Sequence, residues 1–346
     1  MKIKELIRSN ILSLEPYCSA REMIQEGILL DANENPYEQY WEGIQLNRYP
    51  DPNQRELRKE ISSFLGVKPE NVLAGSGSDE VLDWILKLFC QPGQDQVAIA
   101  EPTYGMYSVS AQIFGIPVVE FPLNNEFDFD VELFLDGVSE NIKVLFLCSP
   151  NNPTGNLLDR EQIVTLCRRW GRIVVVDEAY IEFSDAPSLV YELSKVPNLI
   201  VLRTLSKAFG RAGVRLGYAV ASEQIISYFL KVKFPYNLNV LTTKNGCQTL
   251  QESKIFRSNI ESIKEERERI FAELSGIEQI IQVFPSQANF LLFRCPKASQ
   301  IYLRLLEKGI VVRDRSSLLG LKDCIRVSVG TSAENSLFLK ELRRVL

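Results

Sequence analysis

The 346-residue sequence contains no histidine, and this absence removes several classes of active site. A Ser-His-Asp triad, a Cys-His pair, a histidine zinc site and a histidine-ligated haem all require an imidazole. Proton transfer near neutral pH must therefore come from lysine, tyrosine, cysteine, a carboxylate or a bound cofactor.

The cysteines and the apolar segments argue against export and membrane spanning. The seven cysteines include no C-x-x-C pair and are odd in number, which favours reduced thiols, most of them in the core. No apolar run reaches about 18 residues, and the N-terminus lacks the apolar stretch of a signal peptide. We therefore expect a cytoplasmic protein with no membrane partner.

The charge and size point to small-molecule partners. The formal net charge is -5, and Lys and Arg are scattered rather than clustered, which argues against a nucleic-acid partner. At 45% hydrophobic and 24% charged residues, the composition is that of a globular protein long enough for two domains.

Short apolar runs alternate with helical patterns in the first two thirds of the chain. The runs predict buried strands at Val97–Ala100, Lys143–Leu147, Ile173–Val176, Leu199–Leu202 and Leu216–Ala221. The helical patterns lie at Asp79–Cys90, Tyr104–Phe114 and Arg160–Trp170. This alternation predicts an α/β fold with a mostly parallel sheet between two helical layers.

The last third of the chain predicts a second, smaller domain. One long helical pattern rich in charges, Thr243–Ser275, is expected to link the two domains. Beyond it, short strands and helices suggest a small α+β unit. We predict a large domain at 45–255 and a small domain made of 1–44 and 256–346.

Four stretches carry candidate chemistry. GSGSDE (75–80) lies between a strand-like run and a helix and could hold an anion, although a capped turn explains it equally well. CSPNNPTG (148–155) follows a strand; an Asn-Pro turn is the alternative. VDEAYIEF (176–183) ends a strand in carboxylates, for which a structural ion pair is the alternative.

The fourth stretch, RTLSKAFGRAGVRLGY (203–218), places a lysine among small and apolar residues, where it could act as an amine nucleophile. Lys207 alone could be a solvated surface charge. Together with Asp177 and the donors of Ser206 and Arg215, however, it matches the needs of pyridoxal phosphate. That cofactor requires an amine for a Schiff base, a carboxylate for its ring nitrogen and a cradle for its phosphate.

These motifs, in this order, resemble the fold-type I aminotransferases of the aspartate aminotransferase superfamily. Within it, the chain is similar to the histidinol-phosphate aminotransferases. The resemblance runs through LDANENPY (30–37), RYPDP (48–52), GSGSDE, EPTYGMY (101–107), CSPNNPTG, VDEAYIEF, RTLSKAFGRAGVRLGY and IRVSVGT (325–331). One departure is GSDE, where these enzymes often have GADE.

The resemblance implies pyridoxal 5'-phosphate as cofactor and assigns the residues around it. Lys207 would hold the cofactor and shuttle the proton, and Asp177 would keep the pyridine nitrogen protonated. Tyr104 would stack on the ring, while Asn151 and Tyr180 would contact its phenolic oxygen. Four residues would surround the phosphate: Ser78, Asp79, Ser206 and Arg215.

The resemblance also implies a homodimer and a substrate. Tyr49 would reach the cofactor phosphate of the other subunit, so a monomer would have incomplete sites. The implied substrate contacts are Tyr17, Asn33, Arg313 and Arg326. The implied reaction exchanges an amino group between histidinol phosphate and 2-oxoglutarate, with imidazole-acetol phosphate and glutamate consumed in the direction of histidine synthesis.

Other functions remain open on the sequence alone. Relatives of the same fold act on aromatic amino acids or decarboxylate threonine phosphate, and the motifs separate these substrates weakly. A nicotinamide-dependent dehydrogenase is disfavoured because GSGSDE lacks the third glycine of the dinucleotide fingerprint. A non-enzymatic binding protein on the same scaffold is disfavoured by the presence of Lys207.

Overall fold

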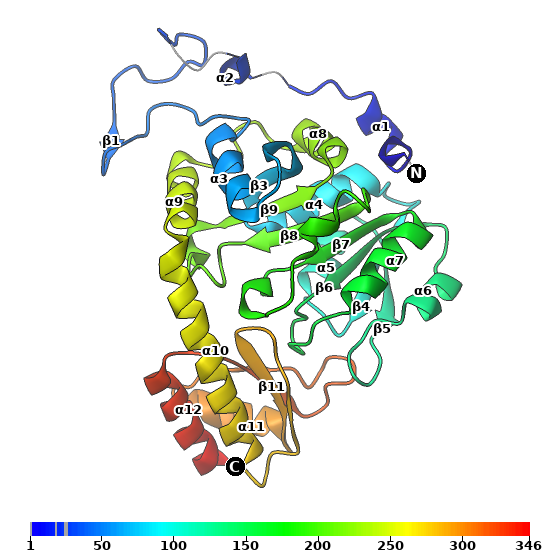
Figure 1. The fold of residues 1–346 in the computed structure, drawn as a ribbon, viewed down its shortest axis with the longest axis vertical. Coiled ribbons are helices and arrows are strands. Elements are labelled where there is room, and N and C mark those ends of the chain that lie inside the picture. Colours follow the sequence, from blue (N-terminus) through cyan, green and yellow to red (C-terminus); the bar gives the residue numbers. More distant parts are fainter. Residues whose placement is uncertain (1, 18, 24–26) are drawn as a thin grey trace.

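The computed structural model describes residues 2–17, 19–23 and 27–346. Within these residues no helix combines the length and apolar character needed to cross a bilayer. The molecule has a large α/β unit, a small C-terminal unit and an N-terminal arm that extends across the large unit (Figure 1).

The large unit is built on a seven-stranded sheet with strand order β3-β9-β8-β7-β6-β4-β5. All strands run parallel except β9, which pairs antiparallel with both β3 and β8. The bounds are β3 Val72–Ser76, β4 Gln96–Glu101, β5 Val118–Pro122, β6 Ile142–Cys148, β7 Ile173–Asp177, β8 Leu199–Thr204 and β9 Leu216–Ala221. The mostly parallel sheet and all five predicted strands are confirmed.

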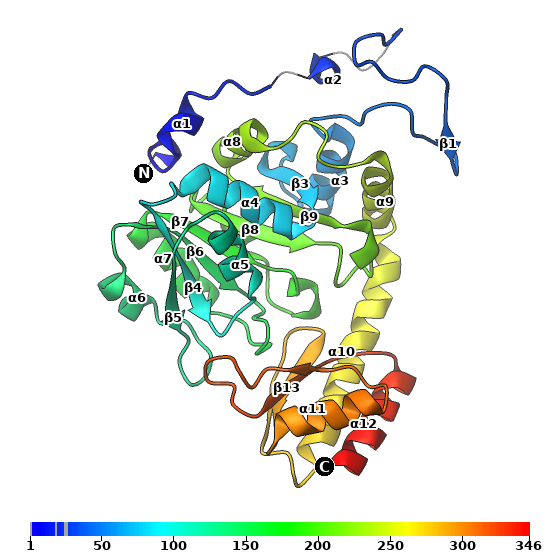
Figure 2. The ribbon, with the colours of Figure 1, turned by 180° about the vertical axis from the view of Figure 1, so that it is seen from behind.

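Helices cover both faces of this sheet, because its central strands are apolar on both sides. One face packs against α4 (Ser78–Phe89), α5 (Met106–Ile113) and α8 (Glu223–Val232). The other packs against α3 (Arg55–Leu65), α6 (Val131–Gly137), α7 (Arg160–Trp170) and α9 (Val240–Gln251). Figure 2 shows the first of these layers in front of the sheet. The predicted three-layer α/β/α fold is confirmed.

The small unit contains a four-stranded antiparallel sheet in the order β10-β11-β13-β12. Its strands are β10 Gln282–Phe284, β11 Phe290–Arg294, β12 Arg313–Asp314 and β13 Cys324–Ser328. One face carries an apolar core formed with α10 (Ser253–Ser275), α11 (Ala298–Glu307) and α12 (Ser332–Val345). The other face meets the large unit, since Phe127 packs with Phe284 and Leu292.

The predicted single helix over Thr243–Ser275 is wrong in one respect: the chain forms two helices, α9 and α10, separated at Glu252. Glu252 has φ -90° and ψ 23°, which ends the first helix without any proline or glycine. The linking role is nevertheless visible in α10. Phe256 belongs to the core of the large unit, and Ile270 and Leu274 belong to the core of the small unit.

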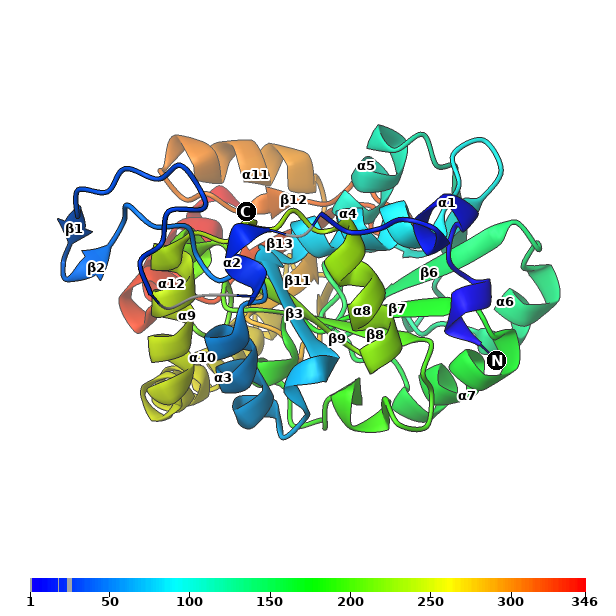
Figure 3. The ribbon, with the colours of Figure 1, turned by 90° about the horizontal axis from the view of Figure 1, so that it is seen from above.

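The N-terminal arm corrects the prediction that the first 44 residues belong to the small domain. Ile3, Ile7 and Ile11 insert into the core on the α4 face of the large sheet, and Arg8 bonds to the end of α4 through its backbone N–H and its guanidinium. The arm includes α1 (Ser9–Leu12), α2 (Ala20–Met23), β1 (Tyr40–Trp41) and β2 (Ile44–Gln45). Figure 3 shows the β1–β2 hairpin projecting from the body of the molecule. The remaining domain boundaries stay predictions.

All six described cysteines are buried and free, as expected for core thiols; Cys18 lies outside the described residues.

Candidate active site

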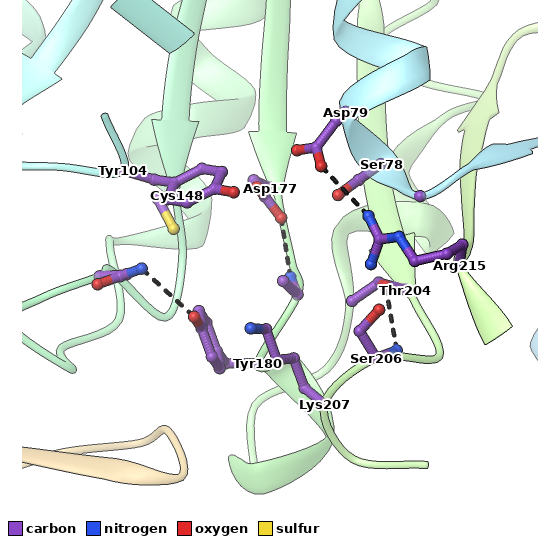
Figure 4. A pocket seen from close by; sticks show the side chains of 13 residues that line it. Ser78, Asp79, Tyr104, Cys148, Asp177, Tyr180, Thr204, Ser206, Lys207 and Arg215 are labelled. Atoms are coloured by element: carbon purple, nitrogen blue, oxygen red, sulfur yellow. Dashed lines mark hydrogen bonds and ion pairs between the residues drawn. The ribbon is translucent and has the colours of Figure 1, made fainter. Parts of the chain in front are cut away.

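A pocket opens at the carboxyl ends of β6, β7 and β8, next to the N-terminus of α4 (Figure 4). Ligands of parallel α/β sheets bind at this edge, because the loops that leave the strands converge there. The lining residues come from five of the quoted motifs: Gly77, Ser78, Asp79, Tyr104, Cys148, Asn152, Asp177, Ala179, Tyr180, Thr204, Ser206, Lys207 and Arg215. Motifs far apart in the sequence thus meet in one cavity.

Lys207 projects into this pocket from the loop after β8, and its Nζ lies 5.5 Å from the centre of the Tyr180 ring. The residue is exposed within the open pocket. Partial desolvation by the pocket walls lowers the pKa of Lys207, and the guanidinium of Arg326 lowers it further. A lowered pKa increases the neutral fraction of the amine, which is the form that attacks a carbonyl.

Asp177 ends strand β7 and is buried beneath the pocket floor. Its Oδ2 accepts a hydrogen bond from the Tyr107 hydroxyl at 2.9 Å, and its Oδ1 accepts one from the Ala179 N–H at 3.0 Å. Burial raises the pKa of Asp177 to about 6, although both hydrogen bonds counteract this effect. A buried carboxylate of this kind is stabilised by a cation, and a protonated ring nitrogen supplies one.

The N-terminus of α4 forms one wall of the pocket and leaves its first N–H groups free of a side-chain cap. The β9 strand approaches it so closely that a Cβ on Gly217 would lie 2.2 Å from the Ser78 nitrogen. Arg215 faces the same wall, with its Nη2 3.4 Å from Asp79 Oδ2. Free N–H groups, a helix dipole and a guanidinium together favour a bound phosphate.

The predicted contact of Asn151 with the cofactor ring is corrected by the structure. The amide of Asn151 is buried and occupied: it donates to Pro102 O and to Thr154 Oγ1, and it accepts from Thr103 Oγ1. The next residue, Asn152, lines the pocket instead, and its Nδ2 lies 3.3 Å from the Tyr180 hydroxyl. The turn geometry therefore places Asn152, and not Asn151, at the pocket wall.

Arg326 reaches this corner from β13 of the small unit. Its Nη1 donates to Asn152 Oδ1 at 2.5 Å, and its guanidinium lies 5.1 Å from the centre of the Phe290 ring. Phe290 in turn makes an edge contact with Tyr180. The small unit therefore reaches a residue that lines the pocket, and the role of Arg326 as a substrate contact stays a prediction.

The other predicted substrate residues do not line this pocket within one chain. Tyr17 is exposed in the N-terminal arm, and Asn33 lies with Tyr49 beside a separate hollow near α9. Arg313 is exposed on β12 opposite Arg326 in the sheet register. Their roles as substrate contacts, and that of Tyr49 toward another subunit, stay predictions.

Tyr107 is a site residue that the sequence analysis missed. It lies three residues after Tyr104 within the quoted motif EPTYGMY, in the first turn of α5, and the two rings make an edge contact with centroids 5.5 Å apart. Its ring stacks on Phe146 with centroids 5.2 Å apart, which fixes the hydroxyl toward the carboxylate. The three-residue spacing between Tyr104 and Tyr107 is the feature of the sequence that could have indicated this role.

The donor set of the pocket fits pyridoxal phosphate. Gly77 and Gly217 allow a close approach at the α4 N-terminus, because a Cβ at Gly77 would lie 2.6 Å from Arg215 Nη2 and a Cβ at Gly217 would lie 2.2 Å from the Ser78 nitrogen. Ser206 and Arg215 line that end of the pocket, Asp177 lies on its floor, and Lys207 points into it between Tyr180 and Ser206 (Figure 4). Phosphate, ring nitrogen and aldehyde groups would each meet a complementary residue.

Comparison with known proteins agrees with this reading. Residues 25–342 match the sequence profile of the family "Aminotransferase class I and II". The chain belongs to this family, whose members are pyridoxal-phosphate-dependent transaminases, and is therefore an enzyme of that chemistry.

Individual relatives are similar over almost the whole chain. The histidinol-phosphate aminotransferase of Parabacteroides distasonis is 43% identical over 345 residues, which is 99% of both chains. The crystal structure of the histidinol-phosphate aminotransferase from Clostridium acetobutylicum superposes with a TM-score of 0.80 and 28% identity, covering 87% of this chain and 91% of that one. That from Sinorhizobium meliloti, in complex with pyridoxal-5'-phosphate, has a TM-score of 0.78 and 27% identity, covering 86% and 82%.

Proposed function

We propose that this enzyme is a pyridoxal-phosphate-dependent aminotransferase that exchanges an amino group between L-histidinol phosphate and 2-oxoglutarate in histidine biosynthesis. The observation that carries the reaction type is the meeting of Lys207, Asp177 and the α4 N-terminus in one pocket. Full-length similarity to histidinol-phosphate aminotransferases supports the substrate.

In this proposal each pocket residue has a separate role. The bound cofactor supplies an electron sink for the carbon that loses its proton. Lys207 attaches the cofactor and moves that proton, because its amine is partly desolvated within the pocket. Asp177 holds the proton on the ring nitrogen, and Tyr180 with Asn152 orients the ring through its phenolic oxygen. Ser78, Asp79, Ser206 and Arg215 bind the phosphate.

Lys207→Ala tests the reaction type. The purified parent, incubated with pyridoxal phosphate and reduced with borohydride, should gain one covalently bound cofactor per chain, and Lys207→Ala should gain none at this position. Transamination of histidinol phosphate should fall by several orders of magnitude in the variant. Lys195→Ala, which alters an exposed lysine paired with Glu192, serves as control. Unchanged activity in Lys207→Ala would refute the mechanism.

A substrate comparison tests the specificity. We expect kcat/KM for histidinol phosphate to exceed that for phenylalanine by 100-fold or more, since a phosphate anchor left without its anion costs several kcal/mol. Decarboxylation of threonine phosphate should be negligible. A higher kcat/KM for phenylalanine, or efficient decarboxylation, would assign the enzyme to one of the alternative activities.

We also propose that the active form is a homodimer. The arm exposes large apolar side chains, including Ile28, Leu30, Tyr37 and Trp41, of which Ile28 is 92% exposed. Such a surface is typical of an interface. The Tyr49 ring stacks on Tyr236 with centroids 4.4 Å apart, and the Tyr49 N–H donates to Glu34 Oε1 at 2.6 Å. The side chain of Tyr49 nevertheless remains half exposed, so it is accessible to a second subunit.

Mixing two inactive variants tests the shared site. In the proposed dimer each site uses Lys207 of one subunit and Tyr49 of the other. A heterodimer of Lys207→Ala and Tyr49→Ala therefore has one site with both substitutions and one site with neither. After joint refolding we expect about a quarter of the parental activity, from statistical assembly. Activity no greater than the sum of the separate variants would refute a site shared between two subunits.

We also propose the cytoplasmic location that the sequence predicts, and cell fractionation tests it.

A further inference from the structure

Three arginines lie on the same face of the small sheet, and only two of them were identified from the sequence. In the β12–β13 pair, Arg313 opposes Arg326, and the Arg315 N–H bonds to Cys324 O at 2.8 Å, which extends the same register. Opposed residues and residues two apart point to the same face of a sheet. Arg313, Arg315 and Arg326 therefore share a face.

This face is the one that meets the large unit. Cys324, which opposes Arg315, packs with Phe127 of the large unit, and Arg326 touches Asn152 in the cofactor pocket. Arg315 and Arg326 are diagonal neighbours on adjacent strands, about 7–8 Å apart at their Cα atoms, which is within reach of one ligand. Arg315 is thus positioned beside the corner where Arg326 enters the site.

No carboxylate of the described residues forms an ion pair with these three guanidinium groups. Among the described residues, Arg313 and Arg315 form no ion pair and no side-chain hydrogen bond, and Arg326 bonds only to a neutral amide. The Nε atoms of Arg315 and Arg326 are buried without a partner. The nearest carboxylate in sequence, Asp314, raises the pKa of Arg315 through its charge, but its oxygens accept hydrogen bonds from Ser299 and Ser316 and none from a guanidinium.

Burial lowers the pKa of Arg315, and the guanidinium of Arg313 lowers it further. Uncompensated guanidinium groups held half-buried beside one another repel, so an anion is needed to stabilise them. A carboxylate carries one charge and is satisfied by one bidentate guanidinium. A phosphate ester carries about −1.5 to −2 charges and three terminal oxygens, so it can use a second guanidinium.

We propose that Arg315 is a specificity residue that, together with Arg326, binds the phosphate ester of the substrate, whereas the carboxylate of the amino donor needs Arg326 without Arg315. This inference rests on the proposed function and adds a residue to it. It explains how one site distinguishes the anionic groups of the two half-reactions: a phosphate group engages both guanidinium groups, and a single carboxylate group engages one.

The test uses Arg315→Gln, which keeps a polar side chain of similar length without charge, and Arg315→Lys, which restores the charge. Because the Arg315 side chain makes no hydrogen bond to a described residue, neither variant should melt below the parent. Arg168→Gln, which removes an exposed charge on the outer helix α7, is the matched control for net charge.

Two measurements on the cofactor-loaded enzyme decide the question. In steady-state kinetics, Arg315→Gln should raise KM for histidinol phosphate tenfold or more and leave KM for glutamate within twofold. In calorimetry, it should weaken the binding of inorganic phosphate by a similar factor and leave glutarate binding unchanged. Arg315→Lys should recover part of the loss.

Unchanged KM and phosphate binding in Arg315→Gln, or equal losses for the phosphate ester and the dicarboxylates, would overturn the inference. Comparison of histidinol phosphate with histidinol separates this result from failure of the proposed function. If the parent itself does not prefer the phosphorylated compound, the proposed function fails and the inference fails with it. If the parent prefers it and Arg315→Gln keeps the same preference, only the inference fails.

Discussion

The Tyr107 hydroxyl donates a hydrogen bond of 2.9 Å to Asp177 Oδ2, and both side chains are buried. The bond stabilises the ionised carboxylate and so lowers the pKa of Asp177 against the larger effect of burial. Tyr107 acts through Asp177 and is therefore a positioning residue.

Tyr107→Phe should weaken cofactor binding ten- to hundredfold, since a hydrogen bond to a charged group contributes about 1.5–3 kcal/mol. The pKa of Asp177 should rise, so the acidic limb of the activity profile should move to higher pH. Fluorescence titration with pyridoxal phosphate and a pH profile of kcat measure both effects. Tyr191→Phe, at an exposed tyrosine, is the control. Parental affinity with an unmoved acidic limb would contradict this role.

Asp177→Asn should stabilise the protein when the cofactor is absent. Burial raises the pKa of Asp177 from its ordinary 3.8 to about 6, so the folded state binds the proton more tightly than the unfolded state. The ionised side chain therefore costs stability as pH rises from about 4 to 6, and the full cost of about 3 kcal/mol persists above that range. Asparagine carries no charge and avoids it.

Melting curves at pH 8 and pH 5, with and without pyridoxal phosphate, check this expectation. Without cofactor, Asp177→Asn should melt above the parent at pH 8, and the difference should shrink at pH 5 as the parent takes up its proton. With cofactor, the parent should gain more than the variant, because only a carboxylate pairs with the protonated ring nitrogen. A variant that melts below the parent at pH 8 without cofactor would show that the buried, ionised Asp177 side chain does not destabilise the fold.

Arg203→Met should destabilise the fold by about 3–5 kcal/mol, because it leaves two buried carboxylates without their cation. Arg203 is 5% exposed; its Nη1 lies 3.3 Å from Glu178 and its Nη2 lies 2.6 Å from Glu182. These carboxylates flank Tyr180, so the loop that carries this tyrosine should loosen as well. Urea unfolding of Arg203→Met, alone and combined with Glu178→Gln and Glu182→Gln, measures the coupling. A loss below 1 kcal/mol, or strict additivity, would contradict it.

Gly217→Ala should weaken cofactor binding more than the same substitution at a glycine with open space around it. The new Cβ would lie 2.2 Å from the Ser78 nitrogen, so β9 and the N-terminus of α4 would have to separate. Gly213→Ala is the matched control, because a Cβ at Gly213 meets nothing within 4 Å. Equilibrium dialysis should show at least a tenfold weaker affinity for Gly217→Ala only. Equal affinities for the two variants would mean that this close approach does not shape the phosphate cradle.

The sequence could predict the sheet and the centre of the pocket, because both follow from local patterns. Buried strands appear as apolar runs; Asp177 ends one of them, and Lys207 lies in the loop after another. The choice between Asn151 and Asn152 could not be made in this way. The two neighbours have identical chemistry, and only the folded turn decides which amide bonds inward to Pro102 and which faces the pocket.

The placement of the N-terminal arm failed for a related reason. The spacing of Ile3, Ile7 and Ile11 indicates one apolar face, but it does not specify which core receives it. Arg315 likewise resembles any surface arginine until the strand register sets it beside Arg326. Contacts between distant segments depend on complementary shapes that no local pattern encodes.

Helix α10 fixes the orientation of the small unit relative to the large unit. Phe256 is fixed in one core and Ile270 in the other, and the helix between them is continuous. One residue inserted between these anchors would turn the small unit by about 100° and advance it by about 1.5 Å. Arg326 would then leave Asn152 altogether. The length of this interval is therefore as strict a requirement for catalysis as any side chain in the pocket, and insertions should be tolerated only outside it.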